Sequence, residues 1–494
     1  MNRRQFLSTA AAPALAAAPA GAGWRAGFAE RDITPAIGME QPGGYGKSFH
    51  RALHDACKVR AAVFSDGART VALVGVDALM VPRALVVSAR RRIAERTRIE
   101  GSAVLVGASH SHSSGPTGMV QPGEYDHAPE FIRKLAYEQT SMADAGYLKR
   151  VEDAIVEAVA QAHASAAAAR LSFGAGLEKS VAYNRRFRMR NGLTWTHPGK
   201  GNPDVVEAAG PVDPEVGVIG VWDAQAKLTG CVVNFCCHAT TSPGGISANW
   251  IYYLENTIRG SFGPGVTVVF LQGFSGDVTQ VDNLDPHVNP GAEAWARLVG
   301  GRVGAEAVKV LLGAVPGSEA LVDARARVWR IPRRMPTAEH VRRARALVES
   351  GKPPAADWIF AKETVLLSTL PPEVEVEVQA VQVGPAVYIA AQGEMFCQLG
   401  LDLKAAKVAP FTWPVELANG CVGYVPTEEA LGPRGGGYET RLTSYSNLAP
   451  SAGRQMVAAG IELARQFRAA RVPEAPLAPR GQPWAYGNVP PELE

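Results

Sequence analysis

Side chains of the types that bind metal ions follow four short apolar runs of this chain. The runs 104–106, 232–235, 268–271 and 387–390 lead into Ser109-His110-Ser111-His112, His238-Ala239-Thr240, Gly273-Phe274-Ser275-Gly276-Asp277 and Gly393-Glu394. Ligands of open α/β sheets bind beyond the carboxyl ends of the strands, so four such ends can assemble one site. Imidazole nitrogen and carboxylate oxygen are zinc ligands, and a catalytic zinc lowers the pKa of a bound water towards neutral. The sequence therefore predicts a hydrolytic metal site centred on His110 and His238.

Each of these residues also has a purely structural interpretation. His110 and His112 are compatible with two ordinary loop histidines, and His238 with a histidine that bonds a backbone carbonyl. Glu394 suits the first turn of a helix, where the dipole favours a carboxylate. Asp277 is predicted to support the site or form a turn rather than to bind the metal. The coincidence of four polar strand ends favours a shared site.

Apolar strands that alternate with helical patterns must position these residues. Buried strands are predicted at 71–76, 103–106, 231–236, 266–271 and 386–390. The segment 374–383 alternates Val with Glu or Gln, which predicts one face in the core and one in water. Helices are predicted at 147–164, 292–312, 337–347, 395–406 and 452–469. The predicted fold class is α/β, with a mixed β-sheet core and flanking helices in a single large domain.

The composition and the N-terminal residues limit the classes of protein to which this chain can belong. The 494 residues carry 50 Lys and Arg against 47 Asp and Glu, and no basic run indicates nucleic acid as a partner. Asn2-Arg3-Arg4 precedes a short apolar stretch and Ala20-Gly21-Ala22, which predicts a Tat-type export signal over residues 1–22 and a periplasmic or secreted protein. No later run is long and apolar enough to span a membrane. A catalytic domain is predicted over 23–471 and a Pro-rich surface tail over 472–494. The oligomeric state is left open.

The six cysteines offer no C-x-x-C spacing, which argues against a structural zinc site. Most lie in apolar runs, where a free cysteine behaves as a small hydrophobe. The sequence does not pair them.

Several motifs occur together in an order that resembles the neutral/alkaline, non-lysosomal ceramidases. They are Asp32-Ile33-Thr34-Pro35, His54-Asp55, Ser-His-Ser-His-Ser-Ser-Gly-Pro at 109–116, Asn184-Arg185, Asn-Phe-Cys-Cys-His-Ala-Thr-Thr-Ser at 234–242, Gly-Asp-Val-Thr at 276–279, Gly393-Glu394 and Gly-Tyr-Val-Pro-Thr-Glu-Glu at 423–429. The resemblance covers most of residues 24–470. It implies an amide hydrolase that uses Zn²⁺ and acts on N-acylsphingosine or a related N-acyl compound.

The resemblance also implies a role for each matching residue. His110, His238, Glu394 and Tyr424 resemble the zinc ligands. His112 and His54 resemble histidines that bond the reacting groups. Arg185 and Tyr438 resemble residues that hold the substrate and stabilise the oxyanion, although Tyr438 lies slightly further from Tyr424 than in the family.

The chain departs from the family pattern in two places. Thr279 stands where the family has a serine, and the following Pro-Asn is lost. The hydroxyl is a nucleophile or a polar group near a metal-bound water, and the lack of an evident activating base favours water. The chain also stops soon after 469, so no C-terminal immunoglobulin-like sandwich is expected. Both departures weaken the inference that the substrate of the predicted site is ceramide.

The resulting hypothesis is a zinc-dependent hydrolase in which metal-activated water attacks an amide carbon. Tyr438 and His112 help zinc to stabilise the oxyanion, and His54 or His112 protonates the leaving amine. The partner is a small-molecule or lipid N-acyl substrate. The alternatives are a hydrolase of another N-acyl or ester compound, an exported binding protein with a degenerate metal site, and a domain whose polar strand ends are only turns.

Overall fold

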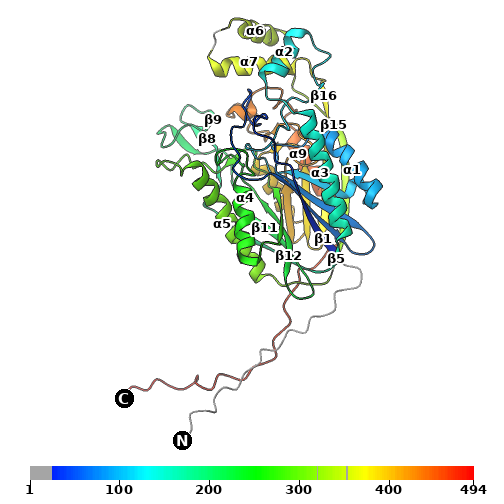
Figure 1. Cartoon of the computed structure of the whole chain (residues 1–494). Helices are drawn as coiled ribbons and strands as arrows, with labels where there is room; N and C mark the ends of the chain where they lie inside the picture. Colours follow the sequence, from blue (N-terminus) through cyan, green and yellow to red (C-terminus); the bar gives the residue numbers. More distant parts are fainter. Residues whose placement is uncertain (1–24, 320, 352–353) are drawn as a thin grey trace.

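Three sheets and their helices form the body of the molecule (Figure 1). A computed structural model describes residues 25–319, 321–351 and 354–494. The export signal predicted for residues 1–22 lies outside this part of the chain. The predicted α/β class with a mixed-sheet core is confirmed.

The first sheet has five strands in the order β4-β3-β2-β1-β5. Their bounds are Val104–Ala108, Thr70–Val76, Lys58–Ser65, Arg25–Asp32 and Ala167–Ala168. Only β3 and β4 pair in parallel here. Helices α1 (Arg83–Thr97) and α3 (Ala145–Ala164) accompany this sheet, and α3 packs on β1 and β2.

The second sheet has the order β13-β12-β11-β6, with β12 and β13 parallel. Its strands are Thr267–Gln272, Leu228–Phe235, Glu215–Trp222 and Arg170–Leu177. Helices α4 (Trp250–Phe262) and α5 (Ala292–Gly313) pack against one another, and α5 contacts β6 and β11.

The third sheet has the order β15-β16-β17-β19, with β17 and β19 parallel. Its strands are Val322–Pro332, Glu373–Val383, Ala386–Ala391 and Phe411–Val415. Helix α9 (Ala452–Ala464) packs on β15, β16 and β17, and α8 (Cys397–Ala405) packs on α9 and β19. One hydrophobic cluster draws residues from all three sheets, so the core lies where they meet.

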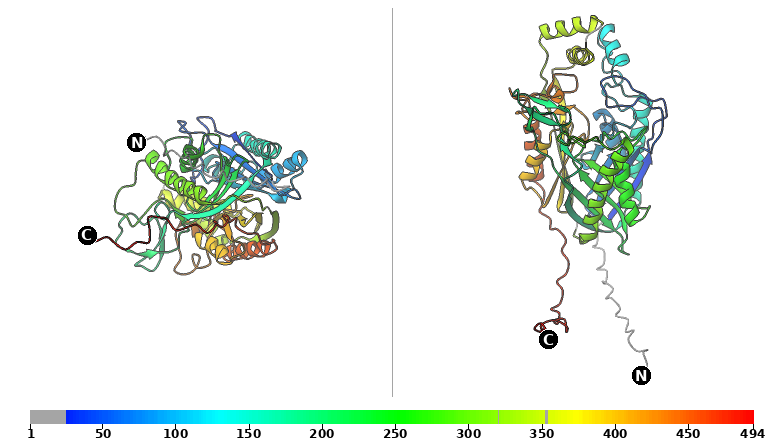
Figure 2. Two further views of the ribbon diagram at one scale, coloured as in Figure 1. Left: turned by 90° about the horizontal axis from the view of Figure 1, so that it is seen from below. Right: turned by 90° about the vertical axis from the view of Figure 1, so that its left-hand side faces the viewer.

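Smaller elements complete the fold. They are β7 (Tyr183–Asn184) with β14 (Val278–Thr279), β18 (Glu394–Met395) with β20 (Tyr424–Val425), β8 (Arg186–Met189), β9 (Thr194–Thr196), β10 (Val205–Ala208), α2 (Glu130–Gln139), α6 (Ala338–Glu349), α7 (Ala355–Leu367) and the 3-10 turns η1 (Gly101–Ala103) and η2 (Tyr438–Thr440). Helices α2, α6 and α7 lie together at one end of the molecule, and the C-terminal segment extends from the other (Figures 1 and 2). No helix in the described ranges is long and apolar enough to cross a bilayer.

The prediction for strand β16 was wrong in one respect. From Val376 onwards the strand is buried on both faces, including Glu377 and Gln379. Arg90 of α1 donates to Glu377 at 2.8 Å, and Asn419 Nδ2 donates to Gln379 Oε1 at 2.8 Å. Because these partners satisfy the polar side chains, the face predicted to lie in water is instead covered by protein.

One side chain ties the second sheet to the third near the site. Asn234 of β12 is buried, and its Nδ2 donates to the carbonyls of Leu271 and Pro414, at 2.9 Å each. These bonds hold the ends of β12, β13 and β19 at fixed spacing. All three strands lead into the candidate site.

We expect Asn234→Ala to lower the free energy of unfolding by about 2 kcal/mol, because it removes a buried side chain that donates two hydrogen bonds. Urea unfolding followed by far-UV circular dichroism measures this. Thr229→Ala, at an exposed position of the same strand, is the matched control and should change stability by no more than about 0.5 kcal/mol. Equal effects of the two substitutions would contradict the role given to Asn234.

Candidate metal centre

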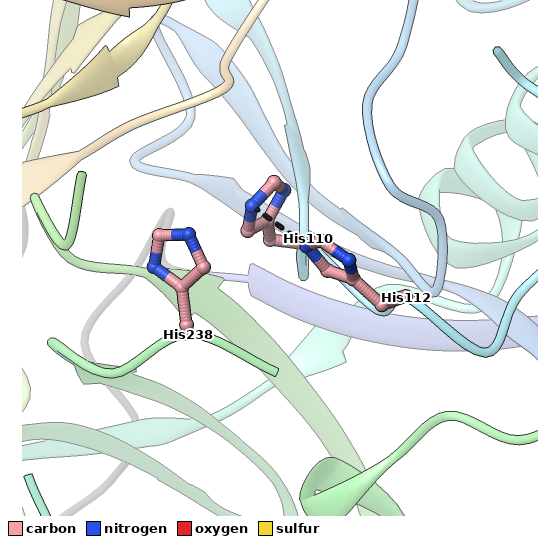
Figure 3. A group of neighbouring side chains, drawn as sticks. All are labelled: His110, His112 and His238. Atoms are coloured by element: carbon pink, nitrogen blue, oxygen red, sulfur yellow. Dashed lines mark hydrogen bonds between the residues drawn. The ribbon is translucent and has the colours of Figure 1, made fainter. Parts of the chain in front are cut away.

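Three imidazoles converge beyond the ends of β4 and β12. His110 and His112 lie on the loop after β4, and His238 lies three residues after β12. One ring nitrogen from each lies within 4.8 Å of the others, and Figure 3 shows the three side chains close together. His110 has φ of 61°, a left-handed conformation that costs a non-glycine residue about 1–3 kcal/mol and is typical of functional sites.

Backbone carbonyls set the orientation of the two central histidines. His110 Nδ1 lies 2.9 Å from the carbonyl of Leu79, and His238 Nδ1 lies 2.8 Å from that of Ser275. A carbonyl can only accept, so each Nδ1 carries the proton and each Nε2 presents a lone pair. Burial lowers the pKa of His238 to about 3, which keeps this ring neutral at neutral pH.

Glu394 directs a carboxylate oxygen at both lone pairs. Its Oε2 lies 3.3 Å from His110 Nε2 and 3.2 Å from His238 Nε2. Within the described chain, His238 Nε2 and Glu394 Oε2 have no hydrogen-bond partner although both are buried.

This geometry fits a metal ion. Three lone pairs that face one another without a proton repel unless a cation lies between them. Two ligands about 2.0–2.1 Å from a tetrahedral zinc lie about 3.3 Å apart, which matches the two distances to Glu394 Oε2. His112 Nε2 lies 3.2 Å from His110 Nε2, so the structure also brings His112 to the edge of this group.

Two tyrosines and an arginine lie beside the histidines. β18 and β20 pair in parallel, with Glu394 opposite Tyr424. The hydroxyls of Tyr424 and Tyr438 lie 3.0 Å apart, and Arg185 donates to the Tyr424 hydroxyl at 3.2 Å. Arg185 is buried, and Glu439 holds it by an ion pair of 2.7 Å. Burial raises the pKa of both phenols above the usual range, so both are protonated in the absence of a cation.

A cavity of about 240 Å³ gives access to this group. It is lined by Gly43, Gly44, Tyr45, Leu79, His110, His112, Met119, Glu394, Tyr424, Tyr438 and Tyr445. The lining is mainly aromatic, and Glu394 is its only carboxylate. The resemblance assigned five of these residues to the site.

Two residues assigned from the resemblance point to other partners. His54 Nδ1 lies 2.7 Å from Asp55 Oδ2, and its ring is near Tyr253 rather than among the lining residues of the cavity. Thr279 is buried, and its hydroxyl donates to Gln280 Oε1 at 3.0 Å. The Thr279 backbone is nevertheless close to the site, because the neighbouring carbonyl of Val278 accepts from His238 N.

Asp277 supports the site rather than joining the histidine group. Its Oδ1 accepts from Cys397 N at the start of α8, and its Oδ2 accepts from Asn184 Nδ2. The backbone carbonyl of Asp277 accepts from Arg185 N. Asp277 therefore links the arginine segment to the segment that follows Glu394.

Sequence reasoning missed a buried network beneath the ligands. Glu416 is fully buried, and its two oxygens accept from Ser275 Oγ at 2.5 Å and from Met395 N at 2.9 Å. Gln272 Nε2 donates to Ser275 Oγ at 2.7 Å. Glu416 thus joins the segment that orients His238 to the strand that carries Glu394. A glutamate directly after the apolar run 411–415 was the available signal.

The chain is similar to known proteins in sequence and in fold. No family model matches the chain. A curated neutral ceramidase from Pseudomonas aeruginosa is 25% identical over 274 residues, which are 54% of this chain and 37% of that protein. The alignment thus spans little more than a third of the relative. The solved structure described as a ceramidase complexed with C2 has a TM-score of 0.65, with 18% identity over 91% of this chain and 77% of the other. The resemblance to the neutral ceramidases is confirmed.

A second solved structure, of neutral ceramidase from Pseudomonas aeruginosa, gives a TM-score of 0.64 with 20% identity, over 91% of this chain and 76% of the other. At these identities the structural matches establish the fold. The ceramidase-like fold therefore extends over nearly the whole chain, well beyond the stretch that matches in sequence.

We expect Glu416→Gln to weaken binding of a metal ion by about 10–100-fold, because it disturbs the partners that orient two of the candidate ligands. Competition with a chelator, read by metal analysis, measures the affinity. Glu462→Gln on the exposed face of α9 is the control and should bind the ion like the unchanged protein. Unchanged affinity in Glu416→Gln would show that this network does not support the metal site.

Proposed function

We propose that this protein is a zinc-dependent hydrolase that cleaves the amide bond of an N-acyl substrate. The observation that carries the proposal is the convergence of His110 Nε2, His238 Nε2 and Glu394 Oε2 at the spacing of zinc ligands. The substrate class is supported by the relatives, which are named ceramidases. N-acylsphingosine and other N-acyl compounds both belong to this class.

The fourth zinc ligand in this proposal is Tyr424. Its ring lines the same cavity as His110 and Glu394. When bound, zinc lowers the pKa of a coordinated water and polarises the substrate carbonyl. A cation beside Tyr424 also lowers the pKa of its phenol, opposing the effect of burial.

Arg185 and Tyr438 are proposed to stabilise the negative charge that develops on the carbonyl oxygen. The Arg185 guanidinium lies 5.2 Å from the centre of the Tyr438 ring, and its ion pair with Glu439 fixes it there. Because burial keeps Tyr438 protonated, its hydroxyl can donate a hydrogen bond. Donors held in place before the reaction are an effective means of stabilising an oxyanion.

His112 is proposed to protonate the leaving amine. It lines the cavity, whereas His54, the other histidine considered for this role, is held by Asp55 outside the lining. Burial lowers the pKa of His112 well below its usual value, so the free ring is a weak base. It can pass on a proton that the attacking water releases, at whichever ring nitrogen faces the substrate.

Export through the Tat route is part of the same proposal. The support is the order of the twin arginines, the apolar stretch and the small residues before residue 23. A periplasmic or secreted hydrolase would reach N-acyl compounds outside the cell.

We expect His238→Ala and Glu394→Ala to lose most of the bound zinc and more than about 100-fold of the activity, because each removes a ligand rather than a supporting partner. Metal analysis measures the bound zinc, and hydrolysis of a panel of fluorogenic N-acyl substrates, ceramide included, measures the activity. The proposal is wrong if both variants keep their zinc and full activity. A protein that binds zinc but hydrolyses no panel member would instead be a binding protein.

We expect Thr279→Ala to lower kcat by no more than about tenfold, because the Thr279 hydroxyl is bonded to Gln280 and water is the proposed nucleophile. Loss of a true nucleophile costs about 10⁴-fold or more. Steady-state kinetics with the best substrate of the panel distinguishes the small loss of kcat from the large one. A collapse of kcat with zinc still bound would identify Thr279 as the nucleophile.

A further inference from the structure

A small helical cap lies at the end of the molecule opposite the C-terminal tail (Figure 1). The helical cap consists of α2, α6 and α7, which pack through their own hydrophobic cluster, including Leu135, Ala344 and Val365. In Figure 1 it stands apart from the three sheets. Its core is therefore separate from the main core, and its link to the site must run through specific contacts.

Two adjacent charged residues in the middle of α7 are completely buried. Lys362 and Glu363 are both 0% exposed, with Lys362 Nζ 3.3 Å from Glu363 Oε1. Burial lowers the pKa of Lys362, and Glu363 opposes that shift. Burying an ion pair carries a desolvation penalty that its contacts must compensate, so such a pair is weak evidence for stability and is compatible with a positioning role.

The contacts of this pair lead to the cavity walls. Lys362 Nζ donates to the carbonyl of Tyr45 at 2.6 Å and to Thr140 Oγ1 at 2.8 Å. Glu363 Oε2 accepts from the hydroxyl of Ser444. Tyr45 lines the cavity, and so does Tyr445, the residue after Ser444. One buried pair thus anchors two wall segments that are about 400 residues apart in the sequence.

The loop that carries Tyr45 passes directly beside His112. A Cβ atom at Gly43 would lie 2.2 Å from His112 Nδ1, and Gly43 has φ of +104°, so only glycine lets this loop approach so closely. The Tyr45 ring lies 5.8 Å from the ring of Phe360 on α7. The ring is therefore fixed by α7 from one side, and the loop that carries it rests on His112.

The cavity that results is small for the proposed chemistry. Its volume of about 240 Å³ is below the about 300–1,000 Å³ of most small-molecule sites. Outside the groups proposed for the metal and the reacting amide, the side chains that line it are those of Tyr45, Leu79, Met119 and Tyr445. An acyl chain that extends towards these side chains would have to displace one of them.

We propose that Tyr45, positioned by the Lys362–Glu363 pair of the helical cap, closes the substrate cavity and restricts the enzyme to N-acyl substrates with a compact acyl group. This inference rests on the proposed amide hydrolysis. It adds a specificity-determining residue and a narrower substrate class. Tyr45 acts through the volume of its ring, and Lys362 and Glu363 act through Tyr45.

A series of amides with one amine and straight acyl chains from acetyl to palmitoyl tests the proposal. We expect kcat/KM of the unchanged protein to fall as the chain lengthens. Tyr45→Ala should raise the ratio of long-chain to short-chain kcat/KM by about tenfold or more, because it removes a ring from the cavity wall. Tyr45→Phe keeps the ring and should leave the ratio within about twofold.

Variants of the helical cap test the positioning role. Lys362→Met should shift the chain-length ratio in the same direction as Tyr45→Ala while zinc content stays unchanged. Phe360→Ala serves the same purpose if Lys362→Met does not fold. Arg343→Ala, in an exposed ion pair of α6, is the matched control and should leave the ratio unchanged.

The outcomes separate this inference from the proposed function. If the unchanged protein hydrolyses no amide, the proposed function fails. The size limit of the cavity is then measured by calorimetry, as the binding of straight-chain carboxylates from acetate to palmitate to the zinc-loaded protein. A chain-length profile, in turnover or in binding, that is the same in Tyr45→Ala and in the unchanged protein overturns the inference. Preference of the unchanged protein for palmitoyl over acetyl overturns it as well.

Discussion

Three lone pairs that face one another in a dry interior are the constraint on which the rest of this structure depends. Two backbone carbonyls accept hydrogen bonds from Nδ1 of His110 and of His238, so both Nε2 atoms are directed at Glu394 Oε2. Without a cation this arrangement is repulsive, and with one it is a ligand set. Three chain segments, from the ends of β4, β12 and β17, must therefore meet to within a few tenths of an ångström. Much of the surrounding polar structure is explained as the means of holding them there.

Holding the ligands requires polar groups inside the core, and those groups must be satisfied. Asn234 spans the ends of three strands, and Glu416 ties the His238 segment to the Glu394 strand. Burial raises the pKa of Glu416 well above its usual range, which disfavours a second negative charge beside Glu394. A buried network of this kind is stable only when its groups are paired, and these contacts pair most of them. The same bonds that stabilise the sheet ends therefore also orient the ligands.

The sequence was informative where local pattern and chemistry coincide. Apolar runs followed by His110, His238 and Glu394 predicted both the strands and the meeting of these residues. It was uninformative where the partner lies far away along the chain. Glu377 looked solvent-facing because nothing local shows that Arg90 reaches it, and Glu416 looked like an ordinary strand end. Helix α7 was not predicted, since its short apolar run with two adjacent charges fits no simple amphipathic pattern.

In this molecule the residues proposed to bind the metal lie at strand ends, whereas the residues proposed to select the substrate lie on loops. The proposed ligands and Arg185 lie on or beside strands, so their spacing tolerates little change. The cavity walls at Tyr45 and Tyr445 instead come from loops that a single buried pair of α7 anchors. A substitution in the helical cap can alter the shape of the cavity without moving a ligand. A chain can therefore match the ceramidases in its metal-binding motifs and in its fold while accepting an acyl group of a different size, because the residues that limit this size lie outside the motifs.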